Sequence, residues 1–264
     1  LVAAGIKPQN YTVSDTGTLN ALGDTRWYRG LTLEPAAGTH LVFPNAVSGY
    51  DQHHTRPITV TSVSGGLLLV ERLAPEEYLL GLGEMPYSWH PAALRAQAIA
   101  GRTYLAATLA GAPRGVMAEF GFDICATPAC QLYLGAGRAQ VAEDGANWAA
   151  AVAATAGRIL LHNDKPALAV YHSTAGATTR SNQDVWGGTA IPYLQAVEVP
   201  AQDSPFASWT YDLGLDQFLN ILAEGGITFS GPVTRVTTVA TLPGGGPYRM
   251  RFTTAAGTVE VTAG

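Results

Sequence analysis

The chain has 264 residues, of which 47% are hydrophobic and 13% charged, and its formal net charge is −5. This composition predicts a globular fold with a sizeable core and excludes an intrinsically disordered chain. It has no basic block, and no apolar run approaches the ~20 residues that span a bilayer, so we expect neither a nucleic-acid partner nor a transmembrane segment. The first residues lack the basic and apolar regions of a signal peptide, so we expect any signal or anchor to be absent from this chain.

Residues 1–73 are predicted to be β-rich. Short apolar runs at 39–43, 57–63 and 66–73 are separated by glycine, proline and small polar residues, which is typical of strands joined by turns. We expect the pair His53-His54, which lies between two of these runs, to be an exposed turn.

The pattern becomes helical at Pro75. Proline is favoured in a first helical turn, and the acidic residues that follow it suit the positive end of a helix. This first helix weakens at Gly81. A second helix is predicted from about Ser88–Pro91 to Ala110, and a third over about 143–156. The second helix has a narrow face of small and apolar residues for close packing, formed by Leu94, Ala98, Gly101, Leu105 and Leu109.

The remaining chain is predicted to mix strands, loops and one amphipathic helix. The expected strands are at 158–162, 167–173, 193–199, 233–242, 247–254 and 258–262. Residues 174–192 are expected to form a loop, and residues 215–226 a helix. Because strands lie at both ends and helices between them, we predict an α+β fold. The β-rich segment 1–73 would join an α+β catalytic core at 74–264, ending in a β-hairpin segment, as one integrated domain.

Glu84 is an isolated carboxylate that follows Gly81 and Gly83 and precedes Met85-Pro86. One interpretation is a carboxylate that faces solvent or accepts backbone N–H bonds. The other is a general acid/base, because a partly apolar pocket formed with Met85, Tyr87 and Trp89 would favour a protonated carboxyl near neutral pH. Most glycosidases use two carboxylates, and neither Asp123 nor Asp184 has a comparable setting. One carboxylate is sufficient where the substrate supplies its own nucleophile.

Residues 77–105, EYLLGLGEMPYSWHPAALRAQAIAGRTYL, resemble the signature of the stage II sporulation protein D family, which includes the amidase enhancers. Three further stretches follow in the family's order: FDICATPACQLYLG, AVAATAGRILLHNDKPALAVYHSTAGATTRSNQDVWGG and IPYLQAVEVP. Matching pieces run from about residue 27 to 212. The chain departs from the pattern at Ala92, Ala177 and Thr179-Arg180, which bears on loop geometry and substrate preference.

The resemblance implies an extracytoplasmic cell-wall protein. Sporulation members are lytic transglycosylases that act on peptidoglycan glycan strands stripped of stem peptides, and their essential acid corresponds to Glu84. In that reaction the 6-hydroxyl of N-acetylmuramic acid attacks its own anomeric carbon and leaves a 1,6-anhydro sugar. Amidase enhancers are instead described as modifiers of a wall amidase, so such an amidase is an alternative partner. A third reading is an ordinary hydrolase that pairs Glu84 with Asp123.

Several other residues are candidates for substrate binding. Aromatic rings can stack on sugars, and Gln97 can bond an N-acetyl group or orient Glu84. Arg102 can bond a carboxylate, or it can be structural and bridge a helix to a loop. His172 and Ser173 are adjacent, so they are not expected to form a nucleophile–base pair, and the polar segment that follows suits a groove rim. The full set is Tyr87, Trp89, Gln97, Arg102, Gln131, Tyr133, His172, Ser173, Thr174, Gly176 and Trp186.

Cys125 and Cys130 are the chain's two cysteines. We favour a disulfide, which an oxidising compartment permits if the backbone brings the Cα atoms within ~7 Å. The alternative is a zinc site in which His172 is the third ligand. Free thiols are the remaining possibility. No cofactor other than this alternative zinc is expected.

Overall fold

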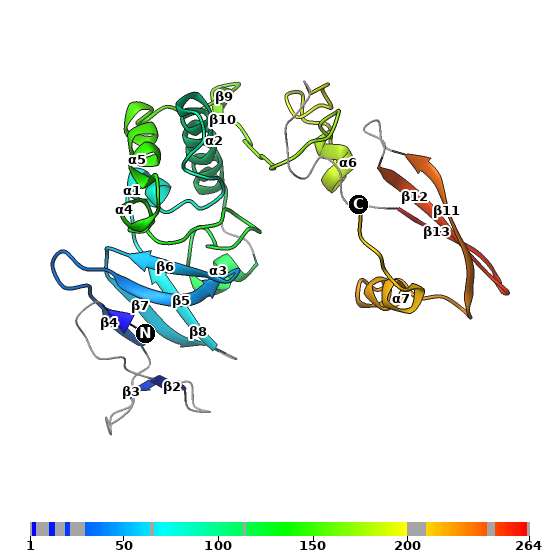
Figure 1. Ribbon diagram of the computed structural model, residues 1–264, viewed down its shortest axis with the longest axis horizontal. Coiled ribbons are helices and arrows are strands. Elements are labelled where there is room, and N and C mark those ends of the chain that lie inside the picture. Colours follow the sequence, from blue (N-terminus) through cyan, green and yellow to red (C-terminus); the bar gives the residue numbers. More distant parts are fainter. Residues whose placement is uncertain are drawn as a thin grey trace. The chain divides into compact units, whose positions relative to one another are not determined.

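The computed structural model describes residues 2–3, 11–13, 19–21, 30–63, 66–112, 115–199, 210–241 and 246–262 (Figure 1). Its contacts divide the chain into two compact units, Leu1–Tyr171 and His172–Gly264, and each is described by itself. The predicted α+β class is confirmed, since helices and strands both contribute. The change of composition predicted at 73/74 lies inside the first unit. No helix within the described ranges is long and apolar enough to cross a membrane.

The first unit begins with antiparallel strands. One sheet has the order β1-β5-β6 and another the order β4-β7-β8, while β2 pairs with β3. Leu41 and Phe43 of β5 are buried with Ile58 and Val60 of β7, because alternate side chains of a strand point to one face. The strand bounds are β1 Val2–Ala3, β2 Tyr11–Val13, β3 Leu19–Ala21, β4 Gly30–Leu33, β5 Leu41–Val47, β6 Tyr50–His54, β7 Ile58–Val63 and β8 Gly66–Glu71.

Four helices of this unit, α1, α2, α4 and α5, gather on one side of β5 and β6 (Figure 1). Prolines stand at the first position of α1 and α2, where the missing N–H has no cost. Trp148 of α5 is fully buried and donates its indole N–H to the Leu79 carbonyl of α1 at 2.7 Å. The helices are α1 Pro75–Leu80, α2 Pro91–Ala110, α3 Val116–Phe120, α4 Arg138–Val141 and α5 Gly145–Ala154, followed by the short strands β9 Leu161–His162 and β10 Lys165–Pro166.

Residues 131–134 connect the helical part to the sheet. Leu82 and Tyr133 form an isolated antiparallel bridge, and the Gly83 N–H donates to the Leu132 carbonyl at 2.9 Å. On the other side, the His53 N–H of β6 donates to the Leu134 carbonyl at 2.8 Å. This segment therefore holds the loop after α1 against the sheet.

The second unit contains two helices and a three-stranded antiparallel sheet of order β11-β12-β13. Phe252 of β12 is buried between Phe218 and Phe229, with ring centroids 6.1 and 4.8 Å away. The elements are α6 Asn182–Trp186, α7 Leu215–Glu224, β11 Val233–Thr241, β12 Pro247–Thr254 and β13 Gly257–Thr262. The predicted helix at 215–226 and the three C-terminal strands are confirmed.

Some sequence predictions were wrong. His53 and His54 belong to β6, and His54 is buried because its Nδ1 bonds the Glu71 carboxylate at 2.7 Å. Leu109 is 48% exposed, so the buried face of α2 ends at Leu105.

Two of the strands predicted from the sequence, at 167–173 and 193–199, are not formed. Residues 167–173 form no strand, and residues 193–199 contribute only the isolated bridge from Glu198 to Thr178. Residues 197–199 pair with residues 177–179 through two backbone hydrogen bonds, from the Thr179 N–H to the Val197 carbonyl at 2.9 Å and from the Val199 N–H to the Ala177 carbonyl at 3.0 Å, and this ladder is too short to form a strand. The predicted loop at 174–192 contains the short helix α6.

Candidate functional site

Glu84 lies in the loop between α1 and α2 and is half-buried. The glycines before it allow residues 131–134 to approach, because a Cβ at Gly81 would collide with the Tyr133 ring and one at Gly83 with the Leu134 side chain. Pro86 prevents α1 from continuing through the loop. The local sequence thus places one carboxylate where two segments distant in sequence meet.

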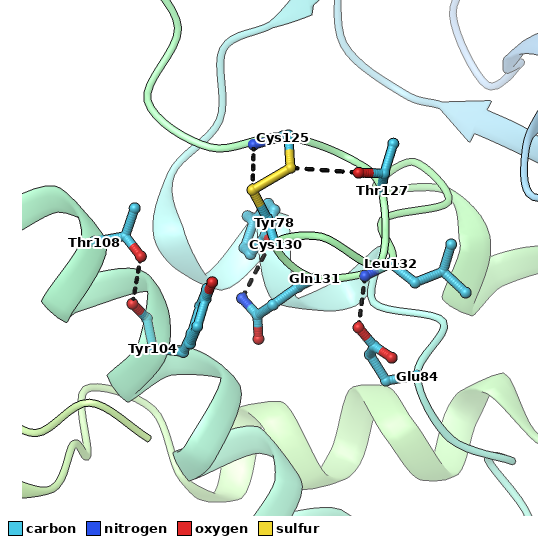
Figure 2. The surroundings of a disulfide bond; sticks show 9 residues. All are labelled: Tyr78, Glu84, Tyr104, Thr108, Cys125, Thr127, Cys130, Gln131 and Leu132. Atoms are coloured by element: carbon cyan, nitrogen blue, oxygen red, sulfur yellow. Dashed lines mark hydrogen bonds between the residues drawn. A yellow bond between two sulfur atoms is a disulfide. The ribbon is translucent and has the colours of Figure 1, made fainter. Parts of the chain in front are cut away.

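A single backbone hydrogen bond fixes the Glu84 carboxylate. Its Oε1 accepts the Leu132 N–H at 2.6 Å, as Figure 2 shows. Within the described residues, its Oε2 has no hydrogen-bond donor. Such an arrangement orients a carboxyl group and leaves one oxygen for a ligand.

Three tyrosines lie close enough to Glu84 to feel its charge. Burial raises the pKa of Tyr171, Tyr104 and Tyr78 above the ordinary value, and the negative charge of Glu84 raises each further. All three hydroxyls therefore remain protonated at neutral pH, as hydrogen-bond donors. None of these three tyrosines is among the site residues predicted from the sequence, although Tyr104 and Tyr171 are only half-buried.

Gln131 joins two of these tyrosines. It is fully buried; its Oε1 accepts the Tyr171 hydroxyl at 2.9 Å, and its Nε2 donates to the Tyr78 hydroxyl at 3.2 Å. Because it precedes Leu132, the same backbone turn sets both the tyrosine network and the hydrogen bond to Glu84 (Figure 2). The structure thus places Gln131 beside the candidate acid as a supporting residue.

Gln97 of α2 faces the Tyr171 hydroxyl. Its amide Nε2 is buried and lacks a hydrogen bond of normal geometry. The contact with Gln97 opposes the rise in the pKa of Tyr171 that burial causes, so Gln97 belongs to the polar network around this tyrosine.

Other predicted binding residues have structural contacts instead. Tyr87 is buried, donates its hydroxyl to the Leu82 carbonyl at 2.6 Å and stacks on Trp148. Tyr133 donates its hydroxyl to Glu71 at 2.5 Å and stacks on Tyr78. Both rings are therefore occupied within the core.

Arg102 is also enclosed by protein. Its guanidinium binds both carboxylate oxygens of Glu76, at 2.8 and 2.7 Å, and its other donors reach the carbonyls of Val152 and Arg158. These contacts join α1, α2 and α5. They match the structural alternative for Arg102, which holds together the helices on either side of the Glu84 loop and its neighbour α5.

Trp89 is 43% exposed in the Glu84 loop, as expected of a ring that stacks on a ligand. The remaining candidates belong to the second unit. There His172, Ser173 and Gly176 are exposed, Thr174 is half-buried, and Trp186 is 63% exposed at the end of α6. Asp184 caps α6 through Ser181, so it is a capping residue. Asp123 is exposed.

Cys125 and Cys130 are joined as a disulfide, with their Cα atoms 5.6 Å apart (Figure 2). The bond closes a small loop immediately before Gln131 and Leu132. With the sulfurs bonded to each other, neither is a thiolate ligand for zinc. Across the described ranges, no group of three His, Cys, Asp or Glu side chains is arranged to hold a metal ion.

Comparisons with known proteins match this chain to stage II sporulation proteins. Residues 63–162 match the family model described as Stage II sporulation protein (SpoIID). The chain is 30% identical to Stage II sporulation protein D of Bacillus subtilis over 173 residues, 59% of this chain and 47% of that protein. It is 32% identical to the protein of the same name from Bacillus amyloliquefaciens over 190 residues, 66% and 52% of the two chains.

A relative with a different name also matches. The chain is 31% identical to the amidase enhancer of Bacillus subtilis over 134 residues, which cover 51% of this chain and 16% of that protein. The chain spans about half the length of the two sporulation proteins.

Proposed function

The chain belongs to the stage II sporulation protein D family, and from this premise we propose that it is a peptidoglycan lytic transglycosylase with Glu84 as its single general acid/base. The substrate is the glycan strand stripped of stem peptides. The bond cleaved is the β-1,4 link from N-acetylmuramic acid to N-acetylglucosamine, and the protein acts outside the cytoplasm as a secreted or wall-associated enzyme.

One observation carries this proposal: a half-buried carboxyl group is oriented by one backbone N–H, and its charge acts on three tyrosines that keep their hydroxyl protons. General acid/base catalysis needs a carboxyl held in place with an oxygen left for the substrate. Hydroxyl donors beside it suit the hydroxyl and N-acetyl oxygens of a sugar chain.

In the first step the protonated Glu84 donates its proton to the glycosidic oxygen. The bond from that oxygen to the anomeric carbon of N-acetylmuramic acid breaks, and the N-acetylglucosamine portion leaves with a new 4-hydroxyl. An oxocarbenium-like centre remains on the muramic sugar. The Leu132 N–H stabilises the carboxylate that Glu84 has become.

In the second step the 6-hydroxyl oxygen of the same muramic sugar bonds to the anomeric carbon. Its proton passes to Glu84, which returns to its starting state. No water is consumed and the product carries a 1,6-anhydro ring. One carboxylate therefore performs both proton transfers, and a second carboxylate is not required.

Mass spectrometry of stripped glycan strands tests the proposal. The parent protein should release fragments lighter by one water than hydrolysis products, and Glu84→Gln should lower the rate on the order of 10²–10⁴-fold, as expected for loss of a general acid/base. Asp123→Asn is the matched control and should cleave like the parent. Loss of activity in Asp123→Asn together with products lacking the anhydro ring would establish the two-carboxylate hydrolase instead.

A second candidate function follows from the relative named amidase enhancer. In that case the protein binds glycan or a wall amidase and cleaves nothing itself. Stimulation of an amidase that persists in Glu84→Gln, with no cleavage of glycan by the parent, would favour this function.

A further inference from the structure

A cavity of about 250 Å³ adjoins the Glu84 loop. Gly83 and Met85, the residues on either side of Glu84 in the sequence, both line it. Arg138 of α4 contributes to the lining, as do Glu143 and Asp144 at the start of α5. The cavity therefore shares its wall with the loop that carries the candidate acid.

Arg138 lines this cavity and has one unsatisfied donor. Its Nε atom is buried and has no hydrogen-bond partner, and Arg138 forms no ion pair with any described residue. Arg138 lies against the Tyr87 hydroxyl: burial raises the pKa of Tyr87 to about 12, and the charge and hydrogen bonding of Arg138 oppose that rise. A buried guanidinium N–H without an acceptor is costly, so an anionic acceptor is the missing element.

The rest of the lining indicates which anion fits. A guanidinium binds a carboxylate through two parallel hydrogen bonds. Glu143 and Asp144 are exposed and line the same cavity. Their ionised carboxylates accept hydrogen bonds and donate none, so they need donors such as hydroxyl groups. A ligand with one carboxylate and several hydroxyls satisfies both sides, since it carries a single negative charge and supplies donors to the acids. A phosphate monoester carries nearly twice that charge, so the two acids repel it more strongly.

We propose that this cavity binds the carboxylate of a carboxylated sugar through Arg138. The inference rests on the proposed function, under which the sugar is a muramic acid and the carboxylate belongs to its lactyl group. A stem peptide converts that carboxylate to an amide and removes its charge. Arg138 is therefore a binding residue that distinguishes stripped strands from peptide-bearing ones and takes no part in proton transfer.

Calorimetric titration of the full chain tests this assignment. The ligands are a tetrasaccharide from stripped strands and the same tetrasaccharide with its carboxyls converted to methylamides, and Glu84→Gln is the background that keeps them intact. The amide should bind roughly tenfold more weakly than the carboxylate, as expected for loss of a charge-assisted hydrogen bond. Adding Arg138→Gln should weaken carboxylate binding by the same factor and abolish the difference between the ligands.

Two further variants make the outcome decisive. Arg138→Lys keeps the charge without the paired donors, so its affinity for the carboxylate ligand should lie between that of the Glu84→Gln background and that of Arg138→Gln. Arg95 is an exposed arginine on α2, and Arg95→Gln should bind like the background. Equal binding of both ligands by the Glu84→Gln protein, or unchanged binding after adding Arg138→Gln to it, would overturn the inference and leave the proposed function standing. If neither ligand binds to any variant, the proposed function fails and this inference fails with it.

Discussion

Each unit contains an Arg–Glu pair, but the two pairs have different surroundings. In the first unit Arg102 is buried and binds Glu76 with both ends of its guanidinium. In the second unit Arg251 pairs with Glu260 at 2.7 Å on neighbouring strands, and both side chains are exposed. Arg102 joins α2 to α1 through Glu76 and to α5 through the Val152 carbonyl. Arg251 and Glu260 lie on β12 and β13, which backbone hydrogen bonds already join.

The sequence separations of the contacts explain this difference. Arg102 reaches Glu76, Val152 and Arg158, which lie 26, 50 and 56 residues away. Arg251 reaches a residue nine positions away across a hairpin. The first unit therefore depends on side chains to bring distant segments together around Glu84, and the second depends mainly on local backbone pairing.

The largest expected effect comes from removing the buried guanidinium. Arg102→Met should lower the free energy of unfolding of the first unit by about 3–5 kcal/mol, since it removes the buried partner of the Glu76 carboxylate and the guanidinium donor to the Arg158 carbonyl. Arg251→Met is the matched variant in the second unit and should cost less than about 1 kcal/mol, because the pair that it breaks is exposed.

Hydrogen exchange followed by mass spectrometry can measure both variants in the same experiment. Arg102→Met should accelerate exchange across α1, α2 and α5, and Arg251→Met should leave β12 protected. Equal effects in the two units would contradict the contrast between side-chain and backbone stabilisation.

Local signals predicted much of both units. Pro75, Pro91 and the periodic apolar residues were sufficient for α1 and α2, and the glycine turns for β11 to β13. Each of these elements depends on contacts within a few residues of itself or across one hairpin.

The parts that sequence reasoning missed depend on distant partners. Burial of His54 is possible because the Glu71 carboxylate, on another strand, bonds its ring nitrogen. Tyr78 and Tyr171 come together because both bond to Gln131, 53 and 40 residues away. No local pattern distinguishes such a tyrosine from an ordinary core residue. Glu84 itself was foreseeable because its flanking glycines and proline are unusual locally.

The disulfide offers a smaller test of the same contrast. Replacing Cys125 and Cys130 by serine should lower the stability of the first unit by about 2 kcal/mol, the value expected for closing so short a loop. Since the chain has no other cysteine, a reducing agent should reproduce this effect and leave exchange in β11 to β13 unchanged. Because the loop precedes Leu132, glycan cleavage should fall as well.

Intact mass and metal analysis distinguish the disulfide from the zinc alternative. The disulfide predicts a mass lower by two hydrogens than that of the reduced chain, no bound zinc and no effect of a chelator. Destabilisation by a chelator, with zinc in the purified protein, would instead support the metal site.

The smallest expected effect is the dependence of the Arg102–Glu76 pair on pH and salt. The Arg102 hydrogen bonds lower the pKa of Glu76 from its ordinary 4.5, with further help from the Gly157 N–H. A carboxyl with a lowered pKa in the folded state contributes stability above pH 4.5 and loses it as the pH falls through the folded-state value. The stability difference between the parent and Glu76→Gln should therefore be largest near neutral pH and shrink in acid below pH 4.5.

Glu260 provides the matched carboxyl in the second unit. Hydrogen bonding to Arg251 lowers its pKa in the same direction, but water and salt screen this exposed pair. Denaturation at pH 7 in low and high salt should show that salt removes the effect of Glu260→Gln and leaves most of the effect of Glu76→Gln, because the Arg102 end of that pair is buried. If salt removed both effects equally, Arg102 would be as solvent-accessible as Arg251, and the first unit would need another explanation for how α1, α2 and α5 hold the Glu84 loop.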